Sequence, residues 1–251
     1  MLIDYSAANG VARITLNRPE KRNALSPELI TLLCAALDRA AGDEAARVIL
    51  LRGAGPDFCA GLDLASLQLA DSGVLDHLED ARRIAGLFRA LRRNPRPIVA
   101  AVHGRAMGGG CGLATACDLV VAAESAQFRY PEINLGFVAA IVAALLRRSV
   151  GEKQAFELLA TGDAISAAEA CRIGLVNRVY PDASFEASAD EYARELAEKS
   201  VSALALTKSL LYHIDGLSLD AAMESGVFVN ALARGTPDAQ RGIEQFVRPK
   251  K

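Results

Sequence analysis

The sequence has few of the residues that build metal centres or disulfide frameworks. Its 251 residues include 5 cysteines and 3 histidines. The cysteines are odd in number and dispersed, which indicates reduced thiols and favours a cytoplasmic protein. The histidines lie far apart and no His-Glu-x-x-His motif occurs. We therefore expect no metal site.

The sequence also lacks clustered charge and long apolar runs. Lys and Arg number 28 against 30 Asp and Glu, the net charge is −2, and no basic block occurs. This balance argues against partners such as nucleic acid or an acidic membrane surface. No uncharged apolar run is long enough to span a membrane, and the N-terminus does not resemble a secretory signal. We expect neither a nucleic-acid partner nor a membrane.

One stretch, Pro97 to Ile133, has the pattern of a β-α-β unit. A short apolar run, Ile98 to Val102, predicts a buried strand, and a second run begins at Leu119. Between them, the glycines at 108–110 lead into small residues that are typical of a tightly packed helix. A glycine turn that enters a helix leaves free N–H groups, which suit an anion or an oxygen that becomes anionic. The alternative is tight helix–strand packing without a ligand.

A second glycine-bearing loop, Gly53 to Gly61, follows another predicted strand. In parallel α/β sheets such loops lie at the same edge, so one backbone N–H group from the loop around Ala60 and one from the loop around Gly109 could converge on one carbonyl oxygen. Glu132 follows the second strand of the central unit and is a candidate to take a proton from the adjacent carbon. The alternative for Glu132 is a surface turn or an acid at a helix start.

The rest of the chain predicts two parts. Residues 1–199 have the pattern of a strand-containing core, and 200–251 that of a helical appendage with apolar residues at helical spacing. The appendage is expected to pack on its own core or on another subunit. A further helical stretch is expected from about Leu62 to Leu91, broken near Gly73.

Several motifs occur in one order along most of the chain: NRPEKRNAL (17–25), FCAGLDL (58–64), AVHGRAMGGGCGLATACDLVVAAESAQF (101–128), PEINLGF (131–137) and LLATGDAISAAEACRIGLVNRV (158–179). Together they resemble the crotonase superfamily, the enoyl-CoA hydratase/isomerase family. The resemblance implies an α/β fold, a spiral of β-β-α units with a C-terminal helical trimerisation region. It also implies a homotrimer or a dimer of trimers.

The resemblance further implies an acyl-CoA thioester substrate and no separate cofactor, since CoA is part of the substrate. Glu132 would act as acid and base, and the amides of Ala60 and Gly109 would hold the thioester oxygen. The residues that the resemblance places at the acyl-CoA site are Arg22, Ala24, Ala60, Gly61, Leu62, Asp63 and Gly109.

One departure from the family bears on the chemistry. Hydratases of the family carry two glutamates, of which one matches Glu132 and the other falls on Gly112. A single base can still move a proton between carbons, as in the double-bond isomerases of the family. Hydration is not excluded either, because a family subset that resembles methylglutaconyl-CoA hydratases has the same Gly-Gly-Gly-x-Gly-Leu pattern. Other readings are decarboxylation, thioester hydrolysis or a non-catalytic acyl-CoA-binding protein. The acids considered as a second base are Asp63, Asp71, Asp76, Glu79 and Asp80.

Overall fold

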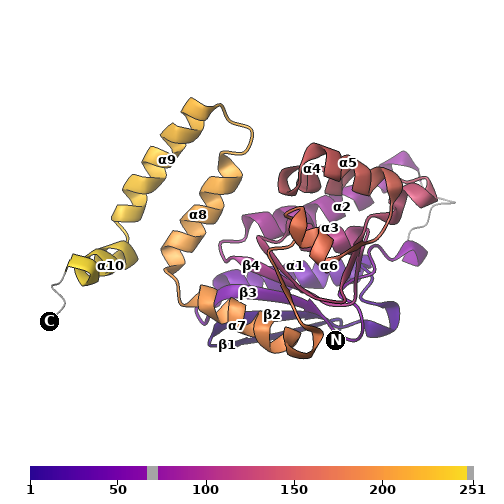
Figure 1. Ribbon diagram of the computed structural model, residues 1–251, viewed down its shortest axis with the longest axis horizontal. Coiled ribbons are helices and arrows are strands. Elements are labelled where there is room, and N and C mark those ends of the chain that lie inside the picture. The colour runs from indigo at the N-terminus through magenta and orange to yellow at the C-terminus, as the bar shows by residue number, and fades with distance from the viewer. Residues whose placement is uncertain (67–72, 248–251) are drawn as a thin grey trace.

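The computed structural model describes residues 1–66 and 73–247 as a mixed α/β fold (Figure 1). The strands are β1 (Ile3–Ala8), β2 (Gly10–Leu16), β3 (Ala46–Gly53), β4 (Ile98–Val102), β5 (Arg105–Met107), β6 (Leu119–Ala123), β7 (Gln127–Arg129), β8 (Ile165–Ser166) and β9 (Arg178–Tyr180). The α-helices are α1 (Pro27–Gly42), α2 (Val74–Arg93), α3 (Gly109–Ala116), α4 (Ala140–Ser149), α5 (Glu152–Thr161), α6 (Ala167–Arg172), α7 (Phe185–Ala197), α8 (Val201–His213), α9 (Leu219–Arg234) and α10 (Pro237–Val247). The 3₁₀ turns are η1 (Pro19–Lys21), η2 (Leu64–Ser66), η3 (Pro131–Leu135) and η4 (Asp182–Ser184).

A mainly parallel sheet forms the centre of the core. Its strand order is β1-β2-β3-β4-β6-β9, and within it β1 and β2 pair antiparallel while the later pairs are parallel. A smaller sheet has the order β5-β7-β8. Every residue of β4 is buried, as a strand covered on both faces requires. The α/β class and the parallel sheet predicted from the sequence are therefore confirmed.

Local sequence signals explain where several elements begin and turn. Asn9 and Gly10 both have positive φ, which permits the tight β1–β2 hairpin turn. The Ser26 hydroxyl accepts from the N–H of Leu29 and Pro27 occupies the first turn of α1. The expected helix from Leu62 is wrong at its start: a 3₁₀ turn covers 64–66, and α2 begins only at Val74 behind Gly73. The N–H of Gly73, the residue before α2, donates to the carboxylate of Asp76, and this hydrogen bond caps the start of the helix.

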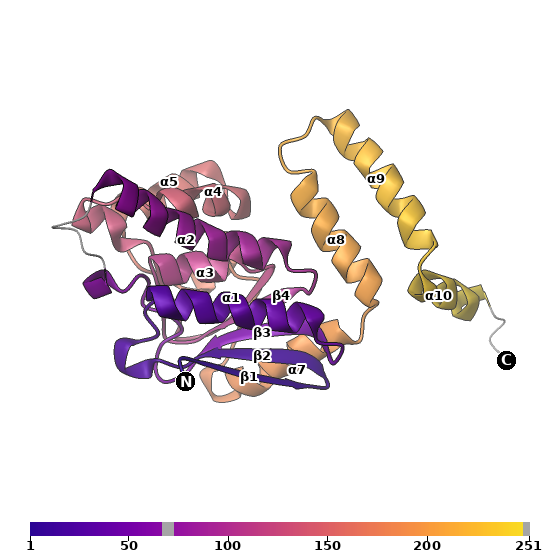
Figure 2. The same cartoon turned by 180° about the vertical axis from the view of Figure 1, so that it is seen from behind.

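Helices α8, α9 and α10 extend away from the core (Figures 1 and 2). The one residue of α8 that is buried is Lys208, whose Nζ lies 2.8 Å from the Asp118 carboxylate. The same Nζ donates to the carbonyls of Leu91 and Arg96. Helix α8 is thus held on its own core by a buried ion pair. No helix in the described ranges has the length and hydropathy to cross a bilayer.

Candidate active site

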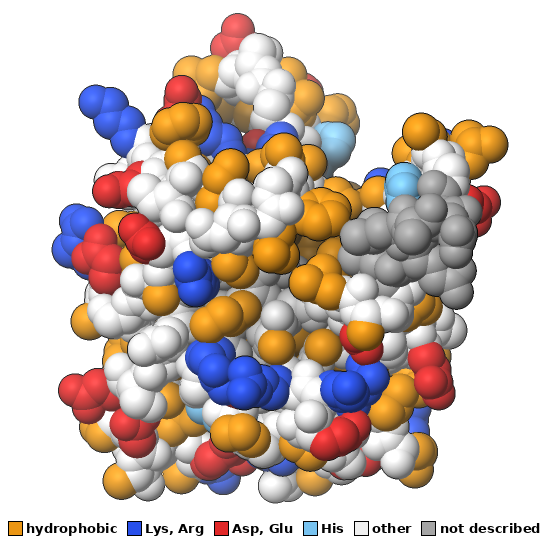
Figure 3. All heavy atoms as spheres, turned by 90° about the vertical axis from the view of Figure 1, so that its right-hand side faces the viewer, with side chains coloured by type: hydrophobic (Ala, Val, Ile, Leu, Met, Phe, Trp, Pro, Cys, Tyr) orange, Lys and Arg blue, Asp and Glu red, His pale blue; other side chains and the backbone are white. Residues whose placement is uncertain are grey.

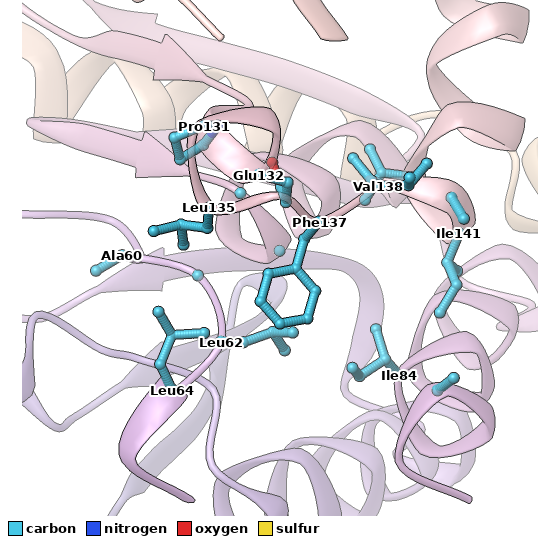
Figure 4. A pocket seen from close by; sticks show the side chains of 17 residues that line it. Ala60, Leu62, Leu64, Ile84, Pro131, Glu132, Leu135, Phe137, Val138 and Ile141 are labelled. Carbon is cyan, nitrogen blue, oxygen red and sulfur yellow. The ribbon is translucent and has the colours of Figure 1, made fainter. Parts of the chain in front are cut away.

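A cavity of about 280 Å³ lies where both glycine loops meet α2, η3 and α4. Figure 4 shows Ala60 and Leu62 on one side, Glu132 and Pro131 above, and Ile84 and Ile141 at the opposite end. Most of its walls are hydrocarbon. Among the described residues that line it, Glu132 is the one with an ionisable side chain. The structure therefore brings Glu132, Ala60 and Gly109 to one cavity, as the sequence predicted.

The two glycine loops lie close together because glycine allows it. Gly61 has φ +97°, and a Cβ placed on it would lie 2.7 Å from the carbonyl oxygen of Met107 and 3.3 Å from the amide nitrogen of Gly109. A Cβ placed on Gly109 would lie 3.6 Å from the amide nitrogen of Leu62. A side chain on Gly61 would force the loops apart, whereas the distances at Gly109 are ordinary contact distances. The backbones of Leu62 and Gly109 are therefore close together, and both residues line the cavity.

The amides differ in whether they are already used. The N–H of Ala60 donates to the carbonyl oxygen of Arg22, with an N–O distance of 2.9 Å. Gly109 opens α3, where helix geometry leaves N–H groups without intrahelical acceptors. Within 1–66 and 73–247, neither Leu62 nor Gly109 donates a backbone hydrogen bond to another backbone group. The free pair of donors is therefore Leu62 and Gly109, whereas the sequence predicted Ala60 and Gly109.

Glu132 lies on η3 with Pro131 at its first position. A Cβ on Gly108 would lie 3.0 Å from its Oε1 atom, so the carboxylate rests against the bare backbone of the first glycine. Its Oε2 is buried without a hydrogen-bond partner in the described part of the chain. Burial raises the pKa of Glu132 because the cavity disfavours the charged form. These properties suit a group that both takes and returns a proton.

Two buried side chains next to the site support its frame. The hydroxyl of Tyr130 lies 2.7 Å from the Thr115 hydroxyl, which donates to the carbonyl oxygen of Cys111. This pair ties the segment before Glu132 to α3, which begins at Gly109. Burial raises the pKa of the Cys111 thiol to about 12. A thiol held protonated at neutral pH serves packing and not nucleophilic attack.

The comparisons with known proteins agree with this geometry. A family model described as enoyl-CoA hydratase/isomerase matches residues 6–251. This chain belongs to the enoyl-CoA hydratase/isomerase family. A Thermus thermophilus protein that carries the name of an enoyl-CoA hydratase is 42% identical over 237 residues, covering 94% of each chain. The rat enoyl-CoA hydratase domain-containing protein 3 is 35% identical over 97% of this chain and 81% of its own.

Solved structures of the family show the same crotonase fold. An enoyl-CoA hydratase of Mycobacterium smegmatis has a TM-score of 0.94 and 33% identity, and the match covers 100% of this chain and 98% of that one. The human enoyl-CoA hydratase domain-containing protein 3 also has a TM-score of 0.94, at 30% identity, with 100% and 99% coverage. The crotonase fold predicted from the sequence is confirmed, and trimerisation through its C-terminal helices stays a prediction.

Hydrocarbon fills the space beside Gly112, where family hydratases carry a second glutamate. A Cβ placed on Gly112 would lie 2.5 Å from Cγ2 of Val142 and 3.1 Å from Cζ of Phe88. Val142 in turn lines the cavity, whereas Gly112 does not. Val142 of α4 therefore forms the part of the cavity wall that a side chain at position 112 would otherwise form. A carboxylate does not fit at position 112 unless Val142 moves.

The acids considered as a second base do not reach the cavity where the structure describes them. Asp63 pairs with Arg18, at 2.7 Å between Oδ2 and Nη1, which lowers the pKa of Asp63. Asp76 accepts from the N–H of Gly73, and Asp80 pairs with Arg83. Glu79 does not line the cavity. Asp71 lies outside the described residues.

The loop assigned by resemblance to CoA lies beside the cavity and not in its wall. Arg22 has φ 50° and an exposed side chain, and Ala24 is buried. Between them, Asn23 is fully buried, and its amide donates to the carbonyls of Ala54 and Asp57. Asn23 was missed from the sequence, although the NAL end of NRPEKRNAL contained it. It fixes this loop on the loop that carries Ala60 and Leu62.

Proposed function

We propose that the chain acts on a CoA thioester through an enolate. The N–H groups of Leu62 and Gly109 hold the thioester oxygen, and Glu132 moves a proton at the neighbouring carbon. Two backbone donors that are fixed before the reaction stabilise the negative charge that develops on the oxygen. Support comes from the adjacent free amides, from the buried carboxylate in the same cavity, and from the family assignment.

The favoured reaction is migration of a double bond along the acyl chain. Glu132 removes a proton from the α-carbon of a 3-enoyl-CoA, and the electron pair of that C–H bond forms the enolate. As the double bond shifts into conjugation, the protonated Glu132 returns the proton to the γ-carbon. No atom is gained or lost. The observation that carries this choice is that Glu132 supplies the one carboxylate among the described residues of the cavity wall, with Val142 occupying the space beside Gly112.

Hydration of a 2-enoyl-CoA is the second candidate, because relatives of the chain carry hydratase names. In that reaction Glu132 alone would have to orient the water and supply the proton to the α-carbon. Family hydratases divide this work between two carboxylates, so we expect hydration to be slow here relative to isomerisation.

The face shown in Figure 3 is compatible with a CoA substrate. Hydrophobic side chains gather around a hollow near its middle, and Lys and Arg side chains lie below the hollow. Cationic side chains suit the phosphates of CoA. The exposed apolar residues of α9 and α10 support assembly with other copies of the chain, because such residues favour burial; a homotrimer or a dimer of trimers is the form that the family resemblance implies. These residues are Leu219, Met223, Val227, Phe228, Leu232, Ile243, Phe246 and Val247.

Glu132→Gln tests the assignment. With a 3-enoyl-CoA as substrate, the rate should fall by about 10²–10⁴-fold, while binding of a saturated acyl-CoA is retained. Glu152→Gln, at an exposed site on α5, is the matched control and should keep the parental rate. Mass spectrometry separates the readings: isomerisation leaves the mass unchanged and hydration adds water. Turnover of Glu132→Gln at the parental rate would disprove the role of Glu132.

A further inference from the structure

Two cavities meet at the first turn of α4. The cavity beside Glu132 ends at Ile84 and Ile141, on the side away from Ala60 (Figure 4). A second cavity, of about 220 Å³, lies between α2 and α4. Of the residues that line these cavities, Ile141 lines both. Ile141 therefore lies at the boundary between the cavity beside Glu132 and the groove between the two helices.

The groove beyond Ile141 has an apolar lining and a cationic side. Ala85, Phe88, Ala144 and Leu145 offer hydrocarbon, and Arg89, Arg92 and Arg93 also line the groove. Phe88 of the groove and Val142 of the cavity both lie against Gly112, so the two spaces are close together on this side as well. An apolar chain that extends from the thioester past Glu132 toward α2 and α4 meets Ile141 before it reaches the groove. Each further methylene that finds an apolar site gains affinity, and one that meets a filled site does not.

We propose that Ile141 sets the length of the acyl chain that the site accepts. A short chain ends against the Ile141 side chain, and a longer chain enters the groove only where this side chain is shortened. The proposal rests on the proposed function, because it places the thioester at Leu62 and Gly109. The competing explanation is that Ile141 only packs against the core, with which it is in contact. In that case its truncation lowers stability without changing chain-length preference.

Binding of saturated acyl-CoAs tests the proposal without requiring turnover. Calorimetric titration with a series from butanoyl-CoA to hexadecanoyl-CoA gives the chain length beyond which affinity stops rising. For Ile141→Ala this limit should move to longer chains, with binding of the chains just beyond the parental limit tightened about tenfold or more. Ile141→Phe should move the limit to shorter chains.

Leu145→Ala is the matched control. Leu145 lies on the same helix and lines the groove, but it does not line the cavity beside Glu132. Its truncation should leave the chain-length limit where it is in the parent. If Ile141→Ala gives a profile parallel to that of the parent, or if Leu145→Ala shifts the limit equally, the proposal is wrong.

The same titrations on Glu132→Gln separate this proposal from the proposed function. That variant should keep the parental chain-length limit, because Ile141 is unchanged. If Glu132→Gln keeps the parental chain-length limit and the parental turnover, the role of Glu132 is refuted and the role of Ile141 is not. A lost reaction in Glu132→Gln together with an unmoved limit in Ile141→Ala refutes only the role of Ile141.

Discussion

Gly112→Ala tests how the wall beside Glu132 is built. The added methyl group would lie 2.5 Å from Cγ2 of Val142, about 1 Å inside the ordinary contact distance of 3.4–4 Å. It would also lie 3.1 Å from Phe88, so it has no free direction in which to relax. Overpacking of this kind in a buried helix costs about 1–3 kcal/mol. For a chain of this length, that loss lowers the melting temperature by roughly 2–4 °C per kcal/mol.

A double-mutant cycle identifies Val142 as the opposing group. Val142→Ala alone should destabilise the chain by roughly 2 kcal/mol, through lost burial and the space it leaves. In Gly112→Ala/Val142→Ala the new methyl group occupies part of that space. The double variant should therefore be more stable than the sum of the single changes predicts, with a coupling free energy of about 1 kcal/mol or more. Urea unfolding of the four proteins measures the cycle.

Gly86 supplies the control for the helix effect of the same substitution. It lies inside α2, and a Cβ placed on it meets no atom within 4 Å. Gly86→Ala should stabilise the chain by about 0.5–1 kcal/mol, because alanine favours the helix and nothing opposes it. If Gly112→Ala is as stabilising as Gly86→Ala, or if the cycle shows no coupling, the contact between Gly112 and Val142 does not define the wall.

Two further predictions concern ionisable groups. Burial raises the pKa of Glu132, so folding binds a proton that the unfolded chain has already released; stability should fall as pH rises from the unfolded pKa through the raised pKa. Glu132→Gln should therefore be more stable than the parent at neutral pH and lose this advantage at low pH, as pH-dependent urea unfolding would reveal; an advantage that persists at low pH would contradict the argument. Lys208→Ala leaves the Asp118 carboxylate, 13% exposed, without its cation and should lower the free energy of unfolding by about 3 kcal/mol. This is the low end of the range for a broken buried ion pair, because Asp118 still accepts hydrogen bonds from the Ile98 N–H and the Tyr212 hydroxyl. An unchanged urea midpoint would show that the pair does not hold α8.

The sequence predicted the elements whose signals are local. The Asn9-Gly10 turn, the Ser26 cap and the buried run at 98–102 each depend on neighbours along the chain, and each is found as expected. The break expected near Gly73 is found at the start of α2, but the helix expected from Leu62 is not, because residues 64–66 form a 3₁₀ turn.

The sequence predicted those parts of the site that depend on the type of residue. Glu132 and the glycines at 108–110 were identified because their chemistry is visible in the sequence. The donor amide on the other loop was not, because every residue there has an N–H and only the fold shows which one is used. The N–H of Ala60 donates to the carbonyl oxygen of Arg22, whereas the N–H of Leu62 donates to no backbone group in the described residues. The buried amide of Asn23 was missed for a similar reason, since its partners lie about thirty residues away along the chain.

The absence of a carboxylate at position 112 and the hydrocarbon wall there have one chemical consequence. Two carboxylates in a single apolar cavity would repel each other, and one would stay protonated. With Val142 in that space, the raised pKa of Glu132 arises from burial alone. Because burial raises its pKa, the Glu132 carboxylate is a stronger base for the substrate proton and is suited to hold that proton before returning it. Proton return to another carbon of the same substrate needs no water and no second acid, whereas hydration needs the water to be held as well. The apolar wall at Gly112 therefore favours isomerisation, because it leaves no space for a carboxylate at position 112 that could hold the water.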